Sequence, residues 1–241
     1  MFESSWDDGH PDDRRLAEEL ALRGLGGTFY VPLGNCEGRP VMTSRDIRTL
    51  AEAGFTIGCH GLDHRRLPAL PTAEARRQIV EGRDRLQDIL GRAVPDFCYP
   101  GGGHDARIRR LVAEAGFTSA RTTEMFRIDS RGDPLIRPTT LQFYPHGGAA
   151  CFRNWLSHGG GGGRLRVAGL YLTRGKEAVL RRSLENAGRF HLWGHSWEIS
   201  EEAMWPALTA FLDLAAALER ERQDHGDRPD NGDRPDNGGI P

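Results

Sequence analysis

Long apolar runs and a leader segment are both missing from this sequence. None of its hydrophobic stretches approaches the roughly 18 to 20 residues that cross a bilayer. The N-terminus has no basic start, apolar middle and small-residue cleavage site of the kind that marks a secretory signal. These absences predict a cytoplasmic protein with no membrane partner.

Cysteine is scarce, and the net charge is close to zero. The four cysteines, Cys36, Cys59, Cys98 and Cys151, lie far apart without a C-x-x-C pair, which favours buried free thiols over a disulfide framework or a zinc knuckle. The 32 basic and 34 acidic residues nearly cancel, leaving a formal net charge of −2. We therefore expect no nucleic-acid partner, and the oligomeric state stays open.

What the sequence does contain is a regular alternation of strand-like and helix-like segments. With 241 residues, 38% of them hydrophobic, the chain can fill the core of one barrel-sized domain. Short β-branched and aromatic runs predict strands, and apolar residues at helical spacing predict the helices between them. The expected strands are 2–6, 28–31, 55–60, 95–99, 117–121, 135–143 and 189–193. The expected helices are 12–23, 44–53, 72–90, 105–115, 177–187 and 202–221.

Two segments do not fit this alternation. The five glycines from Gly159 to Gly163 suit no regular element, and they predict either a mobile loop near a site or a tip without a role. The segment 223–241 repeats Gly-Asp-Arg-Pro-Asp-Asn and has no apolar residue before Ile240, so it buries too little surface to offset the entropy of ordering. We expect one barrel domain over residues 1–222 and a disordered low-complexity tail over 223–241.

The residues at the ends of the predicted strands indicate the type of fold. Strands that alternate with helices pair in parallel, either in an open doubly wound sheet or in a barrel. A (β/α) barrel assembles its active site where its strands end. Chemically useful residues stand at these ends, namely Asp7, Asp8, His60, Gly101, Arg121 and His195. The sequence therefore predicts an α/β protein with a distorted, TIM-like (β/α) barrel of about seven strands.

Asp7 and Asp8 indicate a site of acid–base chemistry beside a metal ion. Adjacent carboxylates repel, so they are kept together where a cation neutralises one while the other moves a proton. Alone, Asp-Asp-Gly is also an ordinary turn sequence. His60 and His64 are spaced by one helical turn, which would place both imidazoles on one face within reach of one ion. Two histidines and one carboxylate leave coordination positions open for water and substrate.

Four motifs in one order resemble those of the polysaccharide deacetylase family, the NodB-homology or family 4 carbohydrate esterases. Residues 5–9 resemble the family's T-F-D-D-G motif, and residues 60–64 resemble its H-[ST]-x-x-H motif. Residues 97–102 are similar to R-P-P-Y-G, and residues 192–195 to L-x-L-H. The resemblance covers roughly residues 2–215. It implies a distorted barrel and a metal-dependent hydrolase that removes an N-acetyl group from an amino sugar or an N-acetylated glycan and releases acetate.

The resemblance also implies which residues would hold the metal and activate water. Asp8, His60 and His64 would bind a divalent ion, with Zn²⁺ expected first and Co²⁺, Ni²⁺ or Mn²⁺ as alternatives. Asp7 would be the general base that deprotonates the attacking water. The carbohydrate substrate is the partner that this reading implies.

The remaining roles fall on the third and fourth motifs. The backbone N–H of Gly101 would stabilise the oxyanion, and His195 would protonate the departing amine. Trp193 would pack against a small acyl group, or it is simply a core aromatic. Trp197 could offer a face to a sugar ring or merely cover the barrel end. The residues expected to contact substrate are Tyr99, Pro100, Gly102, Arg121 and Trp193.

The sequence departs from the family pattern at two places. Cys98 stands where the third motif has an arginine, and no D-x-x-D-W motif is present. Arg121 or Arg137 could take the place of that arginine in orienting Asp7, or each could be an ordinary surface residue. Three functions stay open: a deacetylase acting on a soluble intracellular sugar derivative, a deformylase or other amidohydrolase of the same barrel, and a catalytically silent carbohydrate-binding barrel.

Overall fold

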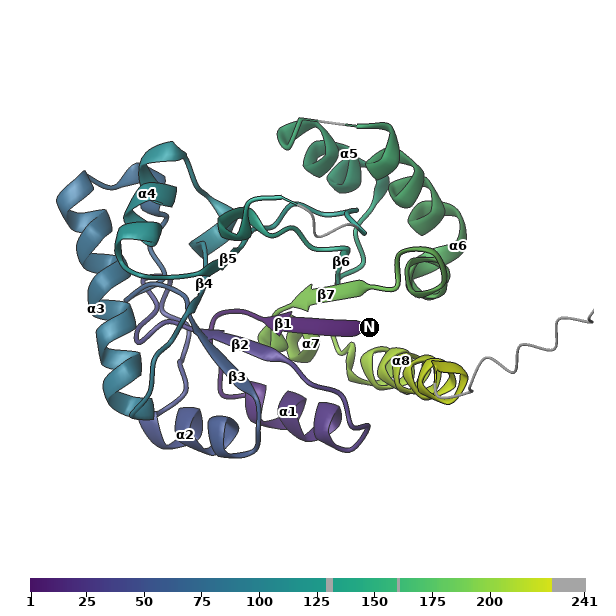
Figure 1. Cartoon of the computed structure of the whole chain (residues 1–241), viewed down its shortest axis with the longest axis horizontal. Coiled ribbons are helices and arrows are strands. Elements are labelled where there is room, and N and C mark those ends of the chain that lie inside the picture. Colours follow the sequence, from purple (N-terminus) through teal and green to yellow (C-terminus); the bar gives the residue numbers. More distant parts are fainter. Residues whose placement is uncertain (129–131, 160, 227–241) are drawn as a thin grey trace, which may run out of the picture.

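A curled parallel sheet of seven strands forms the centre of the molecule (Figure 1). The computed structural model describes residues 1–128, 132–159 and 161–226. The strand order is β5-β4-β3-β2-β1-β7-β6, with every pairing parallel. The strands are β1 (Phe2–Trp6), β2 (Thr28–Val31), β3 (Thr56–Cys59), β4 (Asp96–Cys98), β5 (Ser119–Arg121), β6 (Leu141–Gln142) and β7 (Phe190–Gly194). The predicted barrel of about seven strands is therefore confirmed.

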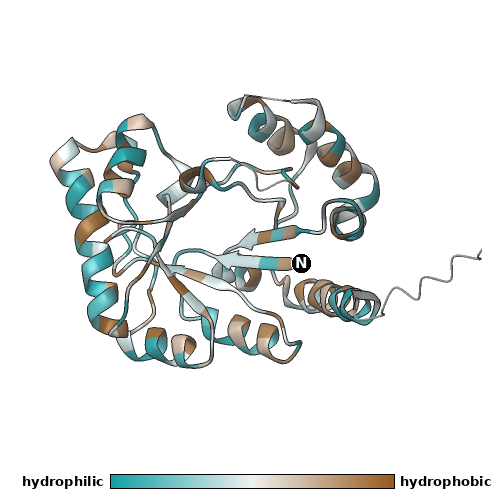
Figure 2. Ribbon diagram, in the orientation of Figure 1, coloured by the Kyte–Doolittle hydropathy of each residue, from teal (hydrophilic) through white to brown (hydrophobic). Residues whose placement is uncertain are grey.

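Helices cover the outer face of the sheet (Figure 1). In chain order they are α1 (Asp13–Ala21), α2 (Ser44–Glu52), α3 (Thr72–Leu90), α4 (Ala106–Glu114), α5 (Gly148–Ser157), α6 (Gly162–Ala187), α7 (Ser196–Glu201) and α8 (Trp205–Gly226), with short 3₁₀ turns at η1 (Leu67–Ala69), η2 (Pro100–Gly102) and η3 (Pro134–Ile136). Along α1 to α4, hydrophilic and hydrophobic segments alternate (Figure 2). Each of these helices buries an apolar stripe, as its spacing of apolar residues requires.

The two edges of the sheet are linked by one extended segment. Arg137 forms an isolated parallel bridge with β5, and four residues later Leu141 pairs with β7. The strand predicted over 135–143 is thus wrong in extent, because η3 occupies its start and only Leu141–Gln142 is regular strand. Pro138 explains the interruption, since proline has no N–H to donate to a ladder.

Other boundaries differ from the sequence prediction around the glycine run. Gly162 and Gly163 begin α6, so the expectation that no regular element tolerates this run is wrong for them; Gly160 lies outside the described residues. A helix's first turn accepts glycine more readily than its interior does. The predicted helix 177–187 is the second half of α6, which is kinked at Gly175. Helices α5 and α7 were not predicted.

The end of the chain is partly described. Helix α8 continues to Gly226, beyond the predicted domain boundary at residue 222, and the rest of the predicted tail, 227–241, lies outside the described residues. Within the described ranges, no helix combines the length and the hydropathy that crossing a membrane needs. The cysteines are free as predicted, although Cys36 is exposed rather than buried.

Candidate active site

The aspartate pair stands at the carboxyl end of β1, and a turn separates its side chains. Asp8 has φ of 75°, in the left-handed region, and Gly9 follows with φ of 58°. A side chain at Gly9 would come within 2.8 Å of Val31, so only glycine allows the chain to turn here. The Asp7 N–H donates to the carbonyl of Gly194 at the end of β7. Both carboxylates are buried, so their charges need partners.

His60 and His64 converge on Asp8, but not through a helical turn. The chain from His60 to Arg66 is a loop, and His64 has φ of 61°, which turns its ring back toward the barrel. The two histidines lie close together as expected, but the helical spacing from which we expected this is not the cause. The loop is held from both sides: the N–H groups of Leu33 and Gly34 donate to the carbonyl of Leu62, and α3 packs closely underneath.

The donor set of Asp8, His60 and His64 fits a divalent ion. Their ligand atoms all lie within 4.8 Å of one another. Oδ1 of Asp8 is 3.1 Å from Nε2 of His64 and 3.5 Å from Nε2 of His60. Ligands about 2.1 Å from a tetrahedral ion lie about 3.4 Å apart, so these separations suit shared coordination. Oδ1 of Asp8 is buried and has no hydrogen-bond partner among the described residues, as expected of an atom that coordinates a cation.

Neighbouring groups fix the orientation of two of these ligands. The carbonyl of Cys98 lies 2.9 Å from Nδ1 of His60, so it can accept the Nδ1 proton and leave Nε2 free for the metal. The indole N–H of Trp197 donates to Oδ2 of Asp8 at 2.8 Å, which leaves Oδ1 facing the histidines. Both contacts are typical of the outer support of a metal site.

The charges of the cluster perturb its titration. Burial by itself raises the pKa of Asp8, but the neighbouring imidazoles of His60, His195 and His64 outweigh it and hold the pKa well below the usual range. Burial lowers the pKa of His60, and Asp7 and Asp8 more than reverse this. The pKa of His64 is lowered by burial and by His60. Asp8 is therefore ionised at neutral pH and available to a cation.

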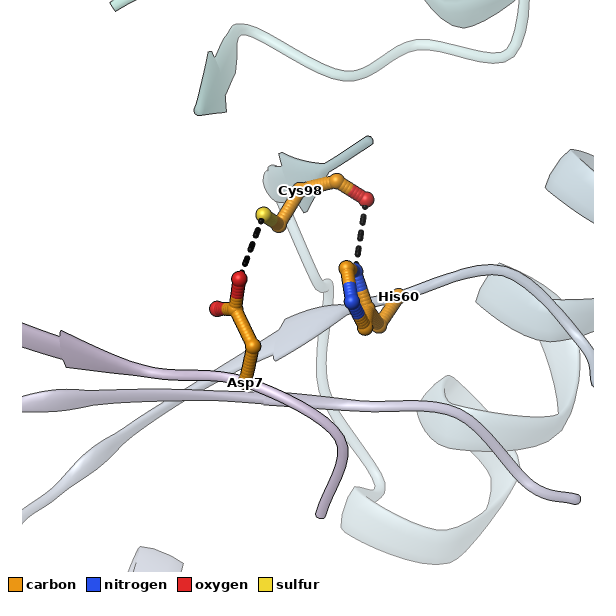
Figure 3. A group of neighbouring side chains, drawn as sticks. All are labelled: Asp7, His60 and Cys98. Atoms are coloured by element: carbon orange, nitrogen blue, oxygen red, sulfur yellow. Dashed lines mark hydrogen bonds between the residues drawn. The ribbon is translucent and has the colours of Figure 1, made fainter. Parts of the chain in front are cut away.

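Asp7 is oriented by a thiol and an indole rather than by an arginine. Asp7 directly after β1, His60 directly after β3 and Cys98 of β4 lie close together (Figure 3). Oδ2 of Asp7 accepts from Nε1 of Trp193 at 2.7 Å and from Sγ of Cys98 at 3.2 Å. Oδ1 is buried and has no partner among the described residues. One oxygen thus fixes the carboxylate, and the other is free to accept a proton.

The two arginines considered for this orienting role lie elsewhere. Nη2 of Arg121 is 3.0 Å from Oε2 of Glu3, and Nη2 of Arg137 is 3.7 Å from the same oxygen. Both line a separate cavity together with Thr28 and Thr56, the first residues of β2 and β3. The expectation that Arg121 contacts substrate or that either arginine orients Asp7 is therefore wrong. Both guanidinium groups lie beside the half-buried carboxylate of Glu3 in β1 instead.

His195 lies on the other side of Asp8 and is held by a carboxylate of its own. Its Nδ1 is 2.8 Å from Oε2 of Glu198, and its Nε2 is 3.9 Å from Oδ2 of Asp8. Burial lowers the pKa of His195, but the hydrogen bond to Glu198 and the charge of Asp8 raise it to about 9. The ring meets Trp193 edge-on and stacks on Trp197. His195 is therefore protonated at neutral pH, with one N–H facing the cavity.

These residues line one cavity of about 530 Å³ at the carboxyl ends of the strands. Asp7, Asp8, His60, His64 and His195 all contribute, together with Gly101, Trp193 and Trp197. The unpredicted helix α5 forms one wall, with Ala150, Arg153, Asn154 and Ser157, and His158 directly follows it. Sequence reasoning missed this wall because nothing in its composition distinguishes it from an ordinary surface helix.

Three predicted substrate contacts lie behind the cavity instead of in it. Tyr99, Pro100 and Gly102 are buried and do not line the cavity. The hydroxyl of Tyr99 donates to the carbonyl of Leu135, and a side chain at Gly102 would collide with Thr123. Their expected contact with substrate is wrong, because they build the turn that presents the neighbouring Gly101 to the cavity.

The fold and the site together define a class of protein: a (β/α) barrel with a candidate metal and acid–base site at the carboxyl ends of its strands. The sequence model of the family described as "Polysaccharide deacetylase" matches residues 2–120. The chain belongs to the polysaccharide deacetylase family, which confirms the resemblance predicted from its motifs.

Two solved structures agree with this fold. A crystal structure described as a "putative polysaccharide deacetylase from Mycobacterium smegmatis" is 18% identical, with a TM-score of 0.60, and the alignment covers 93% of this chain and 89% of that one. A "family 4 carbohydrate esterase from Streptomyces lividans in complex with acetate" is 15% identical, with a TM-score of 0.56, covering 92% and 88%. At such identities the likeness shows the fold alone.

A curated relative covers the first half of the chain. The "Putative polysaccharide deacetylase YxkH" of Bacillus subtilis (strain 168) is 19% identical over 121 residues, which are 50% of this chain and 43% of that protein. The match thus spans less than half the length of the curated relative.

Proposed function

We propose that this protein is a divalent-metal-dependent hydrolase that removes the N-acetyl group from an amino sugar or an N-acetylated glycan. One observation carries the proposal: Asp8, His60 and His64 offer ligand atoms within 4.8 Å of one another, beside the free oxygen of Asp7 and within reach of His195. The family membership supports the reaction, and the donor set of two imidazoles and a carboxylate supports a transition metal, with Zn²⁺ as first choice.

The side chains then divide the work of amide hydrolysis. When bound, the ion would polarise the acetamide carbonyl and make a water molecule more acidic. Asp7 receives the water's proton on Oδ1, because Trp193 and Cys98 already occupy Oδ2. The backbone N–H of Gly101, which lines the same cavity, donates to the carbonyl oxygen as it gains negative charge.

His195 completes the reaction as the general acid. An amide nitrogen leaves only after it gains a proton, and His195 carries one at neutral pH with its pKa raised to about 9. The products are the free amine and acetate. Trp193 narrows the cavity next to His195, which favours a small acyl group at this position. We place the reaction in a single catalytic domain, the barrel over residues 1–222.

The test combines metal analysis with product identification. Purified protein of known metal content is incubated with N-acetylated and N-formylated amino sugars, and acetate and formate are measured. Asp7→Asn and His195→Ala should each abolish acetate release with the metal retained, whereas His64→Ala should lose the metal. His10→Ala is the matched control, because His10 does not line the cavity.

The alternatives give different results in this test. Formate release without acetate would indicate a deformylase. Sugar binding with neither product would favour a silent carbohydrate-binding barrel. Full activity of Asp7→Asn would refute the proposed mechanism.

A further inference from the structure

A chain of side-chain hydrogen bonds leads away from His195 along the wall of the active-site cavity. Oε2 of Glu198 lies 2.8 Å from Nδ1 of His195, and it also accepts from Nε2 of Gln142 at 3.1 Å. On the other side of the amide, Oε1 of Gln142 lies 2.7 Å from Nε2 of His146. The mechanism derived above uses neither Gln142 nor His146, although both line the cavity.

The chemistry of the three groups fixes the direction of each hydrogen bond. A carboxylate oxygen only accepts, so Glu198 must face the amide N–H of Gln142. The amide carbonyl then faces His146, and because a carbonyl also only accepts, Nε2 of His146 carries a proton. Burial lowers the pKa of His146 more than the charge of Glu198 raises it. The ring is therefore neutral at neutral pH, and its Nδ1 is unprotonated.

The fold places Gln142 where it can reach the helix that follows His195. Gln142 ends the edge strand β6, which lies beside β7 (Figure 1), and it pairs in register with Trp193. Paired residues of neighbouring strands point to the same face of a sheet, and both of these side chains line the cavity. Helix α7 begins directly after His195 and carries Glu198. Gln142 thus connects the edge of the sheet to α7.

Two donors on one oxygen restrict the side chain of Glu198 more than one donor does. A glutamate side chain has several rotamers, and choosing one of them costs entropy. With His195 as its only donor, the carboxylate could move together with the imidazole. The second hydrogen bond, from Gln142, ties the same oxygen to the sheet, and the third, from His146, fixes the amide of Gln142. The orientation of the imidazole is then set by the sheet.

We propose that Gln142 and His146 are positioning residues, which hold Glu198 and, through it, His195 in the orientation for proton donation. The inference rests on the proposed function, because His195 is the general acid of that reaction. Since both residues act through Glu198, their loss should lower kcat and leave KM unchanged. A link that only stabilises the fold would instead change the unfolding temperature and leave the turnover of the folded protein as it is.

Steady-state kinetics of acetate release test the role of Gln142. Gln142→Leu keeps the size of the side chain and removes both of its hydrogen bonds, so kcat should fall about 10-fold, as expected for one hydrogen bond to a charged group. Gln87→Leu is the matched control, because Gln87 is also half-buried and bonds Val94 outside the cavity. Equal kcat values for the two variants, or a loss confined to KM, would overturn the proposal.

Two substitutions of His146 separate its hydrogen bond from its bulk. His146→Phe keeps a ring and removes the N–H, so kcat should fall about three- to tenfold, as expected for a hydrogen bond between neutral groups. His146→Gln should retain the activity of the wild type, because its amide N–H can donate to Oε1 of Gln142. Thermal unfolding confirms that both variants are folded. Equal kcat values for His146→Phe and His146→Gln would contradict the relay.

Nitrogen-15 NMR of the full chain tests the proposal without a substrate. At neutral pH, His146 should carry its proton on Nε2, and His146→Gln identifies its signals by their loss. The Nδ1 proton of His195 should shift in Gln142→Leu and stay in place in Gln87→Leu. A proton on Nδ1 of His146, or an unmoved His195 signal in Gln142→Leu, would overturn the proposal. A wild type that releases no acetate would refute the proposed function, whereas these spectra decide the positioning by themselves.

Discussion

The adjacent aspartates have different hydrogen-bond donors, which suits the two different roles proposed for them. The indole of Trp193 and the thiol of Cys98 bond one oxygen of Asp7, and the indole of Trp197 bonds one oxygen of Asp8. Each carboxylate keeps its other oxygen without a described hydrogen-bond partner. In Asp8 that oxygen faces two imidazoles, which suits a metal; in Asp7 it is free to accept a proton.

Replacing Trp193 by phenylalanine tests the orientation of Asp7. Trp193→Phe keeps an aromatic ring but removes the N–H that holds Oδ2, so kcat/KM for acetate release should fall about 10- to 100-fold, the value of a hydrogen bond to a charged group. Metal content should not change. Trp205→Phe is the control, since its indole bonds Ser200 outside the cavity. Equal kinetics for the two variants would rule out the orienting role.

We expect Glu198 to set the pH dependence of His195, the proposed general acid. Burial lowers the pKa of His195, and Glu198 is the first of the groups that raise it to about 9. Activity should therefore hold through neutral pH and fall at alkaline pH, where His195 loses its proton. A cation on Asp8 offsets the effect of that carboxylate, whereas Glu198 still accepts the hydrogen bond from Nδ1 of His195.

The variant Glu198→Gln should shift this profile. Removing the charge lowers the pKa of His195, so the alkaline limb of kcat/KM moves to lower pH. The exposed Glu202 provides the control, and Glu202→Gln should leave the limb in place. An alkaline limb that is unchanged in Glu198→Gln would show that His195 is not the group being titrated.

At the scale of elements, the loop that carries the histidines depends on how closely α3 approaches it. A side chain at Gly82 of α3 would lie 2.7 Å from the backbone of Gly61, between the two histidines in sequence. Glycine inside a helix normally destabilises the helix. At position 82, glycine allows α3 to pack directly against the loop that carries the histidines. Helix α3 thus packs against the loop that carries two residues of the candidate metal site.

Gly82→Ala should therefore destabilise the protein, although alanine favours helix formation more than glycine does. Alanine would push the 60–64 loop outward, lowering the free energy of unfolding by about 1–3 kcal/mol and weakening metal affinity. The matched control is Gly169→Ala in α6, which has nothing within 4 Å of the added carbon and should stabilise by about 0.5–1 kcal/mol. Urea unfolding and metal titration measure both effects. A stabilised Gly82→Ala with unchanged affinity would contradict this account of the packing.

Some helices and strands could be predicted from the sequence, and others could not. Strands β1 to β5 and helices α1 to α4 were predictable because each repeats one apolar period between glycine or proline stops. The strand interrupted at Pro138 was not predictable, because its extent depends on which strand the segment pairs with. Helix α5 was not predictable, because one of its faces lines the cavity instead of packing in the core. Local sequence does not encode either relation.

For the molecule as a whole, the site is a product of tertiary packing more than of motif spacing. The motifs named Asp8, His60 and His64, yet the loop conformation that unites them comes from positive φ at Asp8 and His64. Asp7 accepts a hydrogen bond from Trp193, which lies 95 positions further along the chain than Cys98, the residue in the arginine position of the third motif. No spacing rule predicts such a contact, because only the barrel brings β7 next to β1.

The most direct test of the central claim is equilibrium dialysis against Zn²⁺, with metal counted per folded chain. The wild type and His10→Ala should each retain one tightly bound ion. His64→Ala should lose it while keeping the same circular-dichroism spectrum, since this loop residue contributes a ligand and little core packing. Binding by His64→Ala equal to that of the wild type, or no tight site in the wild type, would contradict the account.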